Sequence, residues 1–390
     1  MSDGPILTVQ SDPTLLAELR RYGKFDTSGC YQCGSCTLSC DLVGNSASFP
    51  RRIIRYALLG LREPLTATLE PWICHDCGDC SLICPRQAEP RISMMTVRNF
   101  LTAQYDWTGI SKRVLGSRAG HIGMLSLITG VTLALIVLYH LWYVGMPAAD
   151  FVTNPLGLEH MFPLMSYYTL TVLLVPLVLL FSRVYRIWGL TMRGQGRARI
   201  PFSAYLAEAW TYVRHSVTHQ LMRKCPDSSR WRGHWLLAFG TVLMLAIKLF
   251  ALRWFQTDSI YAFYHPQRWL GYLAAGCIAY GIGDIFWCRI RAQREICKET
   301  HFEDLIFPIL LLSTALSGLA VHIFRYAGFA LTCHFLYAAH VVIATPMLLV
   351  EMSFGKWSHM IYRPLALYFE AVKARAAQQI PAKEAVPDAA

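Results

Sequence analysis

Apolar and polar positions divide this chain into two regions of different character. Six apolar runs, each near the length of about 20 residues that crosses a hydrocarbon core, occupy 120–146, 163–188, 231–255, 268–288, 304–325 and 329–354. The first hundred residues contain no apolar run of about 18 residues, the lower end of that length. We therefore predict a polar N-terminal domain at 1–105, a linker at 106–119 and a six-helix transmembrane domain at 120–365.

Shorter patterns predict helices outside these runs. After Pro50, apolar residues at helical spacing indicate a helix; they are Ile53, Ile54, Ala57, Leu58 and Leu61. Within 201–224, aromatic and aliphatic residues recur every three or four positions among basic ones, which is typical of an amphipathic helix on the inner membrane surface. Residues 366–390 are Ala-rich and contain Pro, and we expect a flexible tail. The predicted fold class is all-α.

Composition and charge support a membrane protein. The chain has 390 residues, 54% of them hydrophobic and only 16% charged, which is unusual for a soluble domain. Residues 147–162 contain no Lys or Arg, whereas the connections after the second and fourth runs are basic. The positive-inside rule then predicts a multi-pass protein of the inner (cytoplasmic) membrane with both termini in the cytoplasm. The net charge of +11 follows these connections, so we expect no nucleic-acid partner.

Eight of the thirteen cysteines form two copies of the pattern C-x2-C-x2-C-x3-C. In two-cluster ferredoxins with this spacing, the fourth cysteine of each run ligates the other [4Fe–4S] cluster. The spacing therefore predicts one cluster on Cys30, Cys33, Cys36 and Cys84, and a second on Cys74, Cys77, Cys80 and Cys40. A four-cysteine zinc site is the alternative, but such a site needs only four ligands.

The other five cysteines share no spacing. The N-terminus lacks the basic start and apolar core of a secretory signal, so we expect the cysteine-rich part to lie in the reducing cytoplasm, where disulfides are rare. We therefore expect the remaining cysteines to be small apolar packers or free thiols. They are Cys225, Cys277, Cys288, Cys297 and Cys333.

Histidines recur at both ends of the predicted spans. An imidazole within lipid is costly, so it is a functional candidate by default, with helix-packing histidines as the alternative. His121, His234 and His359 form an inner layer, while the outer layer contains His140, His322, His334 and His340. Two layers suggest two b-type haems with bis-histidine ligation, although one haem remains open. His215 and His219 are four residues apart, but a surface face explains them better than a metal site.

Three other ionisable residues lie in the predicted spans, namely Lys248, Asp284 and Glu351. Each is expensive in hydrocarbon unless it faces a cavity or a partner. Lys248 could pair with a haem propionate or a quinone carbonyl, and Asp284 or Glu351 could accept the protons of a quinol. Structural ion pairs that face inward are the alternative.

These motifs resemble a known family. With the segments "RGHWLLAFG" and "HMIYRPL", the chain resembles the membrane subunits (Qmo C) of quinone-interacting membrane-bound oxidoreductase complexes. In that family an HdrC-like iron–sulfur module is fused to a cytochrome b domain like the gamma subunit of nitrate reductase. The resemblance implies that His340 and His359 are the haem ligands of the last span, with His234 as partner of His359. The partner of His340 is then His140 or His322.

The resemblance also implies a function for an enzyme subunit. Menaquinol would be oxidised in the membrane, and its electrons would pass through haem b and the two clusters to cytoplasmic HdrA-like flavin and iron–sulfur subunits. Adenylylsulfate reductase would be the downstream partner in dissimilatory sulfur metabolism. The alternatives are the membrane arm of a heterodisulfide-reductase-type complex, and a structural anchor whose clusters and histidines carry no electrons.

Overall fold

All the regular secondary structure among the described residues is helical. The computed structural model describes residues 10–27, 29–44, 48–141, 158–192, 200–223, 228–255, 257, 259–292, 295–298 and 302–379. No strand occurs among these residues, which confirms the all-α prediction. The chain forms two compact units. We call Met1–Ser117, Phe181–Leu221 and His359–Ala390 the cluster unit, and Arg118–Leu180 and Met222–Ser358 the span unit.

Within the described residues, six helices are long and apolar enough to cross a membrane, as the sequence predicts. They are α9 (Arg118–Tyr139), α11 (Leu158–Met192), α15 (Ser228–Phe250), α17 (Pro266–Arg291), α19 (Phe302–Tyr326) and α20 (Ala330–Pro346), which continues into a π-helical turn, η4 (Met347–Met352). Many leucines and valines on these helices are exposed, including Leu127, Leu133 and Leu135 on α9. Apolar side chains that face outward in this way suit contact with lipid rather than water.

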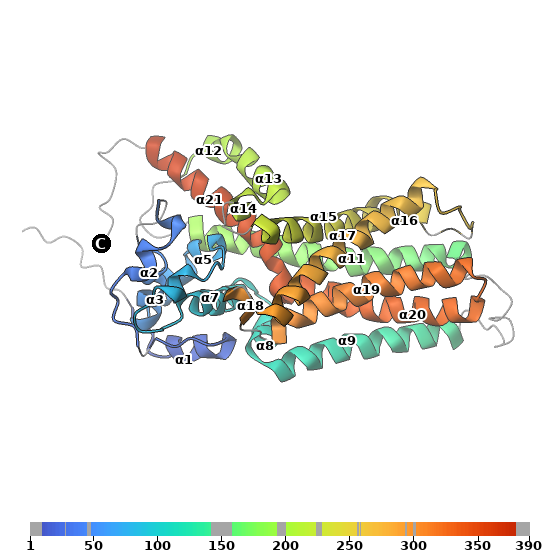
Figure 1. Ribbon diagram of the computed structural model, residues 1–390, viewed down its shortest axis with the longest axis horizontal. Coiled ribbons are helices and arrows are strands. Elements are labelled where there is room, and N and C mark those ends of the chain that lie inside the picture. The colour runs from blue at the N-terminus through green and yellow to red at the C-terminus, as the bar shows by residue number, and fades with distance from the viewer. Residues whose placement is uncertain are drawn as a thin grey trace, which may run out of the picture. The chain divides into compact units, whose positions relative to one another are not determined.

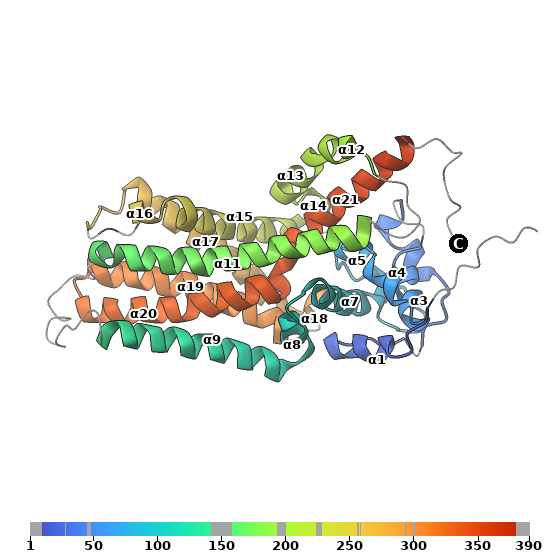
Figure 2. The same ribbon diagram turned by 180° about the vertical axis from the view of Figure 1, so that it is seen from behind.

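Small residues and an apolar core hold the span unit together. The helices α15 and α17 pack closely, because a Cβ at Gly240 would come 2.7 Å from the Ala274 carbonyl oxygen. Next to this contact, Ile278 and Ile282 pack with Leu311 and Met347. Figures 1 and 2 show α19 along α20, and α20 along α9.

The N-terminal part of the cluster unit is built from short helices. They are α1 (Leu15–Leu19), α2 (Ser35–Leu38), α3 (Arg51–Leu58), α4 (Arg62–Thr66), α5 (Glu70–Ile73), α6 (Asp79–Leu82), α7 (Pro90–Tyr105) and α8 (Ile110–Gly116). The predicted helix after Pro50 is α3, and it buries Ile53, Ile54 and Ala57, while Leu58 is exposed. Burying its apolar stripe against the core stabilises a helix that is too short to persist alone.

The segment predicted as one amphipathic helix at 201–224 is interrupted. It forms α12 (Phe202–Ala207), α13 (Ala209–Thr218) and α14 (Gln220–Arg223). His219 adopts a left-handed conformation with φ 46°, which ends α13. The helix α13 lies along α21 (His359–Gln379), where Arg375 Nε donates to Glu208 Oε1 at 2.8 Å.

Three predicted segments differ from the structure. The flexible tail at 366–390 begins as helix, because buried residues continue at helical spacing through Phe369, Val372 and Ala376 to the end of α21. Residues 380–390 lie outside the described residues. The linker at 106–119 contains α8, whose Ser111 N–H donates to Asp106 Oδ2 at 2.7 Å. The transmembrane domain at 120–365 also differs, since 181–221 and 359–365 belong to the cluster unit.

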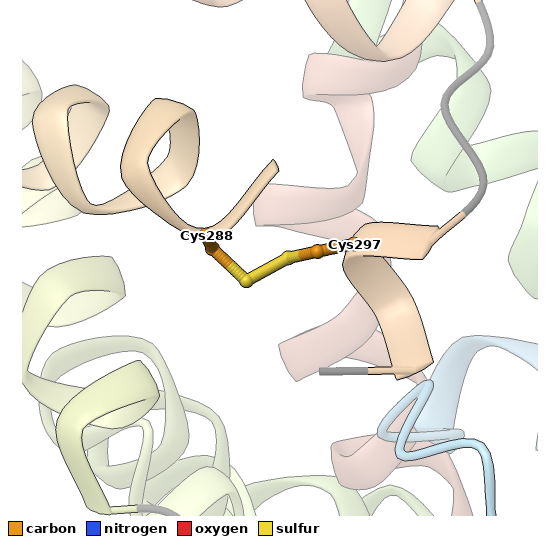
Figure 3. The surroundings of a disulfide bond; sticks show 2 residues. All are labelled: Cys288 and Cys297. Atoms are coloured by element: carbon orange, nitrogen blue, oxygen red, sulfur yellow. A yellow bond between two sulfur atoms is a disulfide. The ribbon is translucent and has the colours of Figure 1, made fainter. Parts of the chain in front are cut away.

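Two cysteines that were expected to be free are paired. Figure 3 shows the disulfide between Cys288, near the end of α17, and Cys297 on α18 (Glu295–Lys298). Their Cα atoms lie 5.9 Å apart. The proximity arises because the chain turns back after α17, which spacing alone does not reveal. Cys277 and Cys333 are buried free thiols, as expected, and Cys225 lies outside the described residues.

Candidate functional site

The two cysteine motifs adopt the same backbone. Gln32 and Asp76, in equivalent positions, both have φ 56°, and the glycines that follow, Gly34 and Gly78, have φ 88° and 100°. These left-handed turns allow the chain to reverse tightly between cysteines, which glycine permits without steric cost. A short helix then begins after each glycine. The duplication that the sequence suggests is therefore also present in the conformation.

The structure brings Cys84 of the second motif to three cysteines of the first. Cys30, Cys33, Cys36 and Cys84 line one cavity, together with Arg51, Ile54, Pro85, Arg86 and Ala88. Burial raises the pKa of the Cys36 thiol, and the neighbouring Cys30, Cys33 and Cys84 add to the rise. This is the crossed grouping that the spacing predicts for the first cluster.

The other four cysteines also interact across the motifs. Burial raises the pKa of Cys80, and charges on Cys74, Cys77, Cys36 and Cys40 raise it further. Burial likewise raises the pKa of Cys40 to about 11, with Cys74 contributing. Thiols gathered in this way stay protonated unless a cation binds them, because metals bind the thiolate. The donor set therefore fits an iron-containing group.

Backbone and side-chain donors point at the sulfur atoms. The amide of Asp76 donates to Cys74 Sγ at 3.4 Å, and the amide of Ala88 donates to Cys84 Sγ at 3.4 Å. Gln32 Nε2 lies 3.5 Å from Cys30 Sγ. Such donors stabilise thiolate charge and help to set the reduction potential of a cluster.

Three arginines that sequence reasoning missed hold the second motif. Arg91 on α7 pairs with Asp76 at 3.2 Å, and Arg98 on the same helix donates to the carbonyl oxygens of Pro71 and Cys74. From α21, Arg363 lies 2.5 Å from His75 Nδ1. The seven-residue spacing of Arg91 and Arg98, which places them on one helix face, was the available signal.

An aromatic group lies next to this motif. Trp72, two residues before Cys74, contacts Tyr362 edge-on at 5.1 Å between ring centroids. Tyr105 lies 6.3 Å from Trp72 and 5.9 Å from Tyr362. Burial raises the pKa of Tyr362 to about 12, so its side chain stays a neutral phenol at ordinary pH. These rings anchor α21 to the part of the cluster unit that carries the cysteines.

His340 has the hydrogen bonds that a metal-ligating histidine needs. Its Nδ1 lies 3.1 Å from the Thr314 carbonyl oxygen and 3.0 Å from Ser317 Oγ, both on α19. An Nδ1–H that donates to a carbonyl leaves the lone pair on Nε2, and such contacts orient a ligating ring. A Cβ at Gly318 would lie 3.2 Å from His340 Cε1, so the glycine makes room for the ring.

The remaining histidines differ in their surroundings. His322 Nε2 lies 2.5 Å from Tyr272 Oη, so this nitrogen is already engaged. His140 is half-buried at the end of α9. His234 lies on α15, and the neighbouring Gly233 packs against Asp284 of α17, since a Cβ there would come 2.9 Å from Asp284 Oδ2. His359 is the first residue of α21 in the cluster unit.

Four other residues that the sequence singled out are His121, Glu351, His215 and His219. His121 Nε2 bonds Glu351 Oε1, and both side chains are buried. Burial lowers the pKa of His215, and lowers that of His219 to about 4, which keeps both imidazoles neutral. Across the described ranges, no group of three or more His, Cys, Asp or Glu side chains could hold a single metal ion, these two histidines included.

Comparison with known proteins identifies the cysteine-rich segment. Residues 29–89 match the family model described as a 4Fe-4S dicluster domain. This segment is a 4Fe-4S dicluster domain. The dicluster domain contains all eight cysteines of the two motifs and the arginines that line the cavity beside Cys84.

Curated relatives share the dicluster domain. A protein of Archaeoglobus profundus that is named as similar to the C subunit of heterodisulfide reductase is 34% identical over 77 residues, which are 20% of this chain and 41% of the relative. The iron-sulfur protein C 2 of the CoB–CoM heterodisulfide reductase of Methanocaldococcus jannaschii is 36% identical over 95 residues, 24% of this chain and 50% of the relative.

A third relative has the same extent. The C2 protein of an H(2)/formate:CoB-CoM heterodisulfide,ferredoxin reductase from Methanococcus maripaludis is 41% identical over 75 residues, 19% of this chain and 40% of the relative. The chain thus spans half or less of the length of these relatives. No solved structure matches the chain.

Proposed function

We propose that this chain is the membrane subunit of an oxidoreductase complex, in which it carries electrons between menaquinol and cytoplasmic partners. The observation that carries the proposal is the union of a dicluster domain with six helices that can cross a membrane. One chain with both features can connect a reaction in lipid to a reaction in water. A cluster-bearing domain without spans, or spans without an electron carrier, would not make that connection.

We assign the first cluster to Cys30, Cys33, Cys36 and Cys84, and the second to Cys74, Cys77, Cys80 and Cys40. The cavity that the first four cysteines line supports the assignment, and the influence of Cys74 on Cys40 supports the placement of Cys40 with the second motif. A bound [4Fe–4S] cluster supplies one-electron transfer, with a potential set by hydrogen bonds, charge and exposure. The chain contributes the sulfur ligands and the amide donors at Cys74 and Cys84.

We assign two b haems to the span histidines. His340 is the ligand with the strongest support, because its Nδ1 is held by α19 and its Nε2 is left as the acceptor nitrogen. We take His140 as its partner in preference to His322, whose Nε2 is engaged by Tyr272. The second pair is His234 with His359, as the family resemblance implies. A bound haem supplies one-electron transfer, while the protein supplies ligands and a low dielectric.

We propose Lys248 as a residue that meets a quinone oxygen or a haem propionate. It lies on α15, and a cationic side chain within a span is costly unless it faces a cavity or a partner. Asp284 and Glu351 are the carboxylates of the spans that are candidates for proton acceptance. The inner membrane location, with both termini in the cytoplasm, follows from the positive-inside distribution of basic residues.

For partners, we propose HdrA-like flavin and iron–sulfur subunits, with adenylylsulfate reductase downstream. This assignment rests on the family resemblance. A heterodisulfide-reductase-type complex is the second candidate, favoured by the names of the three relatives. The proteins that copurify with the intact complex distinguish the two.

The test is spectroscopy of the purified complex with metal and haem analysis, before and after addition of a menaquinol analogue. We expect about eight non-haem irons, as two cubanes require, and b haem that the quinol reduces. Clusters without any quinol-reducible haem would contradict the electron-transfer proposal and favour a structural anchor. One haem in place of two would confine the route to a single pair of histidines.

A further inference from the structure

A buried histidine–glutamate pair joins the first and last spans of the span unit. His121 lies in the first turn of α9, and Glu351 lies in η4 at the end of the last span. His121 Nε2 bonds Glu351 Oε1, and each side chain is 1% exposed. Gly355 leaves space for the carboxylate, since a Cβ there would meet Glu351 Oε2. Burying two ionisable groups is costly, so their retention within spans points to a role beyond packing.

The backbone around Glu351 is also unusual. The last span changes from α-helix to π-helix at Met347–Met352, directly after Pro346. A proline inside a helix removes one hydrogen bond and bends it, and single π-turns occur frequently at functional sites. The π-turn redirects Glu351 from the course of a regular helix, and in this position its carboxylate reaches His121 of α9.

His121 has a second ring nitrogen that is unused. Its Nδ1 is buried and has no hydrogen-bond partner among the described residues. An imidazole held by a carboxylate through one nitrogen, with the other nitrogen available, is the arrangement of a general base. The carboxylate fixes the tautomer and stabilises the imidazolium that forms on protonation.

The other charged groups around the pair are engaged elsewhere. On α9, the Arg118 guanidinium lies 4.7 Å from the ring centroid of Phe302. The same ring meets His121 edge-on at 5.6 Å. On α19, Asp304 pairs with Lys356 of η5 (Lys356–Ser358) at 2.5 Å. Lys356 and Arg118 therefore have other partners than the carboxylate of Glu351.

We propose that His121 and Glu351 form the proton-accepting pair of quinol oxidation, which rests on the quinol function proposed above. Oxidation of one quinol breaks two O–H bonds and releases two protons and two electrons. The electrons leave one at a time to the b haem. His121 Nδ1 takes the first proton, and the imidazolium passes its Nε2 proton to Glu351. Glu351 then returns this proton to Nε2 as Nδ1 releases its own proton to water, which restores the starting tautomer before the second proton is taken.

The test compares His121→Gln and Glu351→Gln with the wild-type complex. We expect haem reduction by a menaquinol analogue to slow by about 100-fold or more, the range of a lost general base. Iron content, haem content and the dithionite-reduced spectrum should remain those of wild type. We also expect the infrared redox-difference spectrum to lose a protonated-carboxyl band in Glu351→Gln. Glu351→Asp should restore part of the rate.

Two controls isolate the pair. His265→Gln removes a half-buried imidazole, which stacks on Tyr261, and Asp304→Asn removes the carboxylate that pairs with Lys356. Both should leave the rate and the infrared band unchanged. Loss of one haem in His121→Gln would make His121 an iron ligand, and unchanged rates in both variants would make the pair structural. Either result overturns the inference. The proposed function still stands in that case if the quinol reduces the haem of the wild-type complex. If wild-type haem is not quinol-reducible, the proposed function itself fails.

Discussion

Arg183 and Asp106 form an ion pair in which both side chains are fully buried. Arg183 Nη2 lies 3.0 Å from Asp106 Oδ1, and each side chain is 0% exposed. Asp106 also accepts hydrogen bonds from the amides of Thr108 and Ser111, so the pair connects α11 to the start of α8 within the cluster unit. The pair thus fixes the segment that was expected to be a linker.

Removal of one partner should destabilise the cluster unit strongly. Asp106→Ala leaves a buried guanidinium without its counter-ion, which typically costs about 3–5 kcal/mol. We expect a clear fall in the thermal midpoint of the detergent-solubilised protein, followed by circular dichroism. The control is Glu370→Ala, which removes a partly exposed pair with Lys373 and should change stability by less than about 1 kcal/mol. A midpoint like that of wild type in Asp106→Ala would contradict a structural role.

The same carboxylate predicts how stability depends on pH. Burial opposes ionisation of Asp106, but hydrogen bonds from Ser111 and Thr108 and the charge of Arg183 outweigh it and lower its pKa. A group with a lowered native pKa stabilises the fold above its unfolded value, near 3.9 for Asp. That contribution is lost as the pH falls through the native pKa. We expect the difference in thermal midpoint between wild type and Asp106→Ala to shrink as the pH is lowered from 6 into the acid range.

The crossed ligand assignment predicts different losses from two matched variants. Cys84→Ser should disturb the cluster on Cys30, Cys33 and Cys36, because Cys84 lines their cavity. Cys40→Ser should disturb the other cluster, with which Cys40 interacts through Cys74. Each variant should keep about four of eight irons, and low-temperature EPR should show a different remaining signal in each. Loss of the same signal from both would refute the crossing.

Sequence patterns predicted the fold class and the span count because both depend on local periodicity. Apolar runs set the six helices, and the paired motifs set the positions of eight cysteines within the dicluster domain. The left-handed turns at Gly34 and Gly78 are local as well, because each depends on the glycine at that position rather than on distant contacts.

Contacts between distant segments could not be predicted in this way. Arg363 reaches His75, and Glu351 reaches His121, across 288 and 230 positions. The disulfide of Cys288 and Cys297 depends on how the chain turns after α17. The helical start of the expected tail was missed because its polar, Ala-rich composition hid a buried stripe that ends at Ala376.

His340 should depend on the small residue opposite it. Gly318→Val would place side-chain atoms where His340 Cε1 already lies, because a Cβ at this position comes 3.2 Å from that atom. We expect a loss of haem equal to that in His340→Ala, measured by the pyridine haemochrome spectrum. Gly276→Val is the matched control, since a Cβ there meets nothing within 4 Å. Full haem content in Gly318→Val would contradict the proposal that His340 binds haem.

The exposed side of α12 and α13 should lie in the lipid headgroup region. One face of these helices packs on α21, where Tyr368 Oη donates to the Tyr205 carbonyl at 2.9 Å. The other face presents an apolar stripe of Phe202, Leu206, Trp210, Val213 and Val217, and Trp210 is 69% exposed. Such a stripe beside basic residues is typical of helices that lie in a membrane interface.

Collisional quenching tests this placement. In a variant whose other tryptophans are replaced by phenylalanine, we expect lipids brominated near the headgroup to quench Trp210 more strongly than aqueous iodide does. Trp107, which is 62% exposed in the cluster unit and bonds Ser182 Oγ, provides the comparison in a second single-tryptophan variant. Replacing Leu206 and Val213 by Glu should reduce the quenching of Trp210 by lipid, because it introduces charge into the apolar face. Preferential quenching by iodide would place the stripe in water or against another protein of the complex.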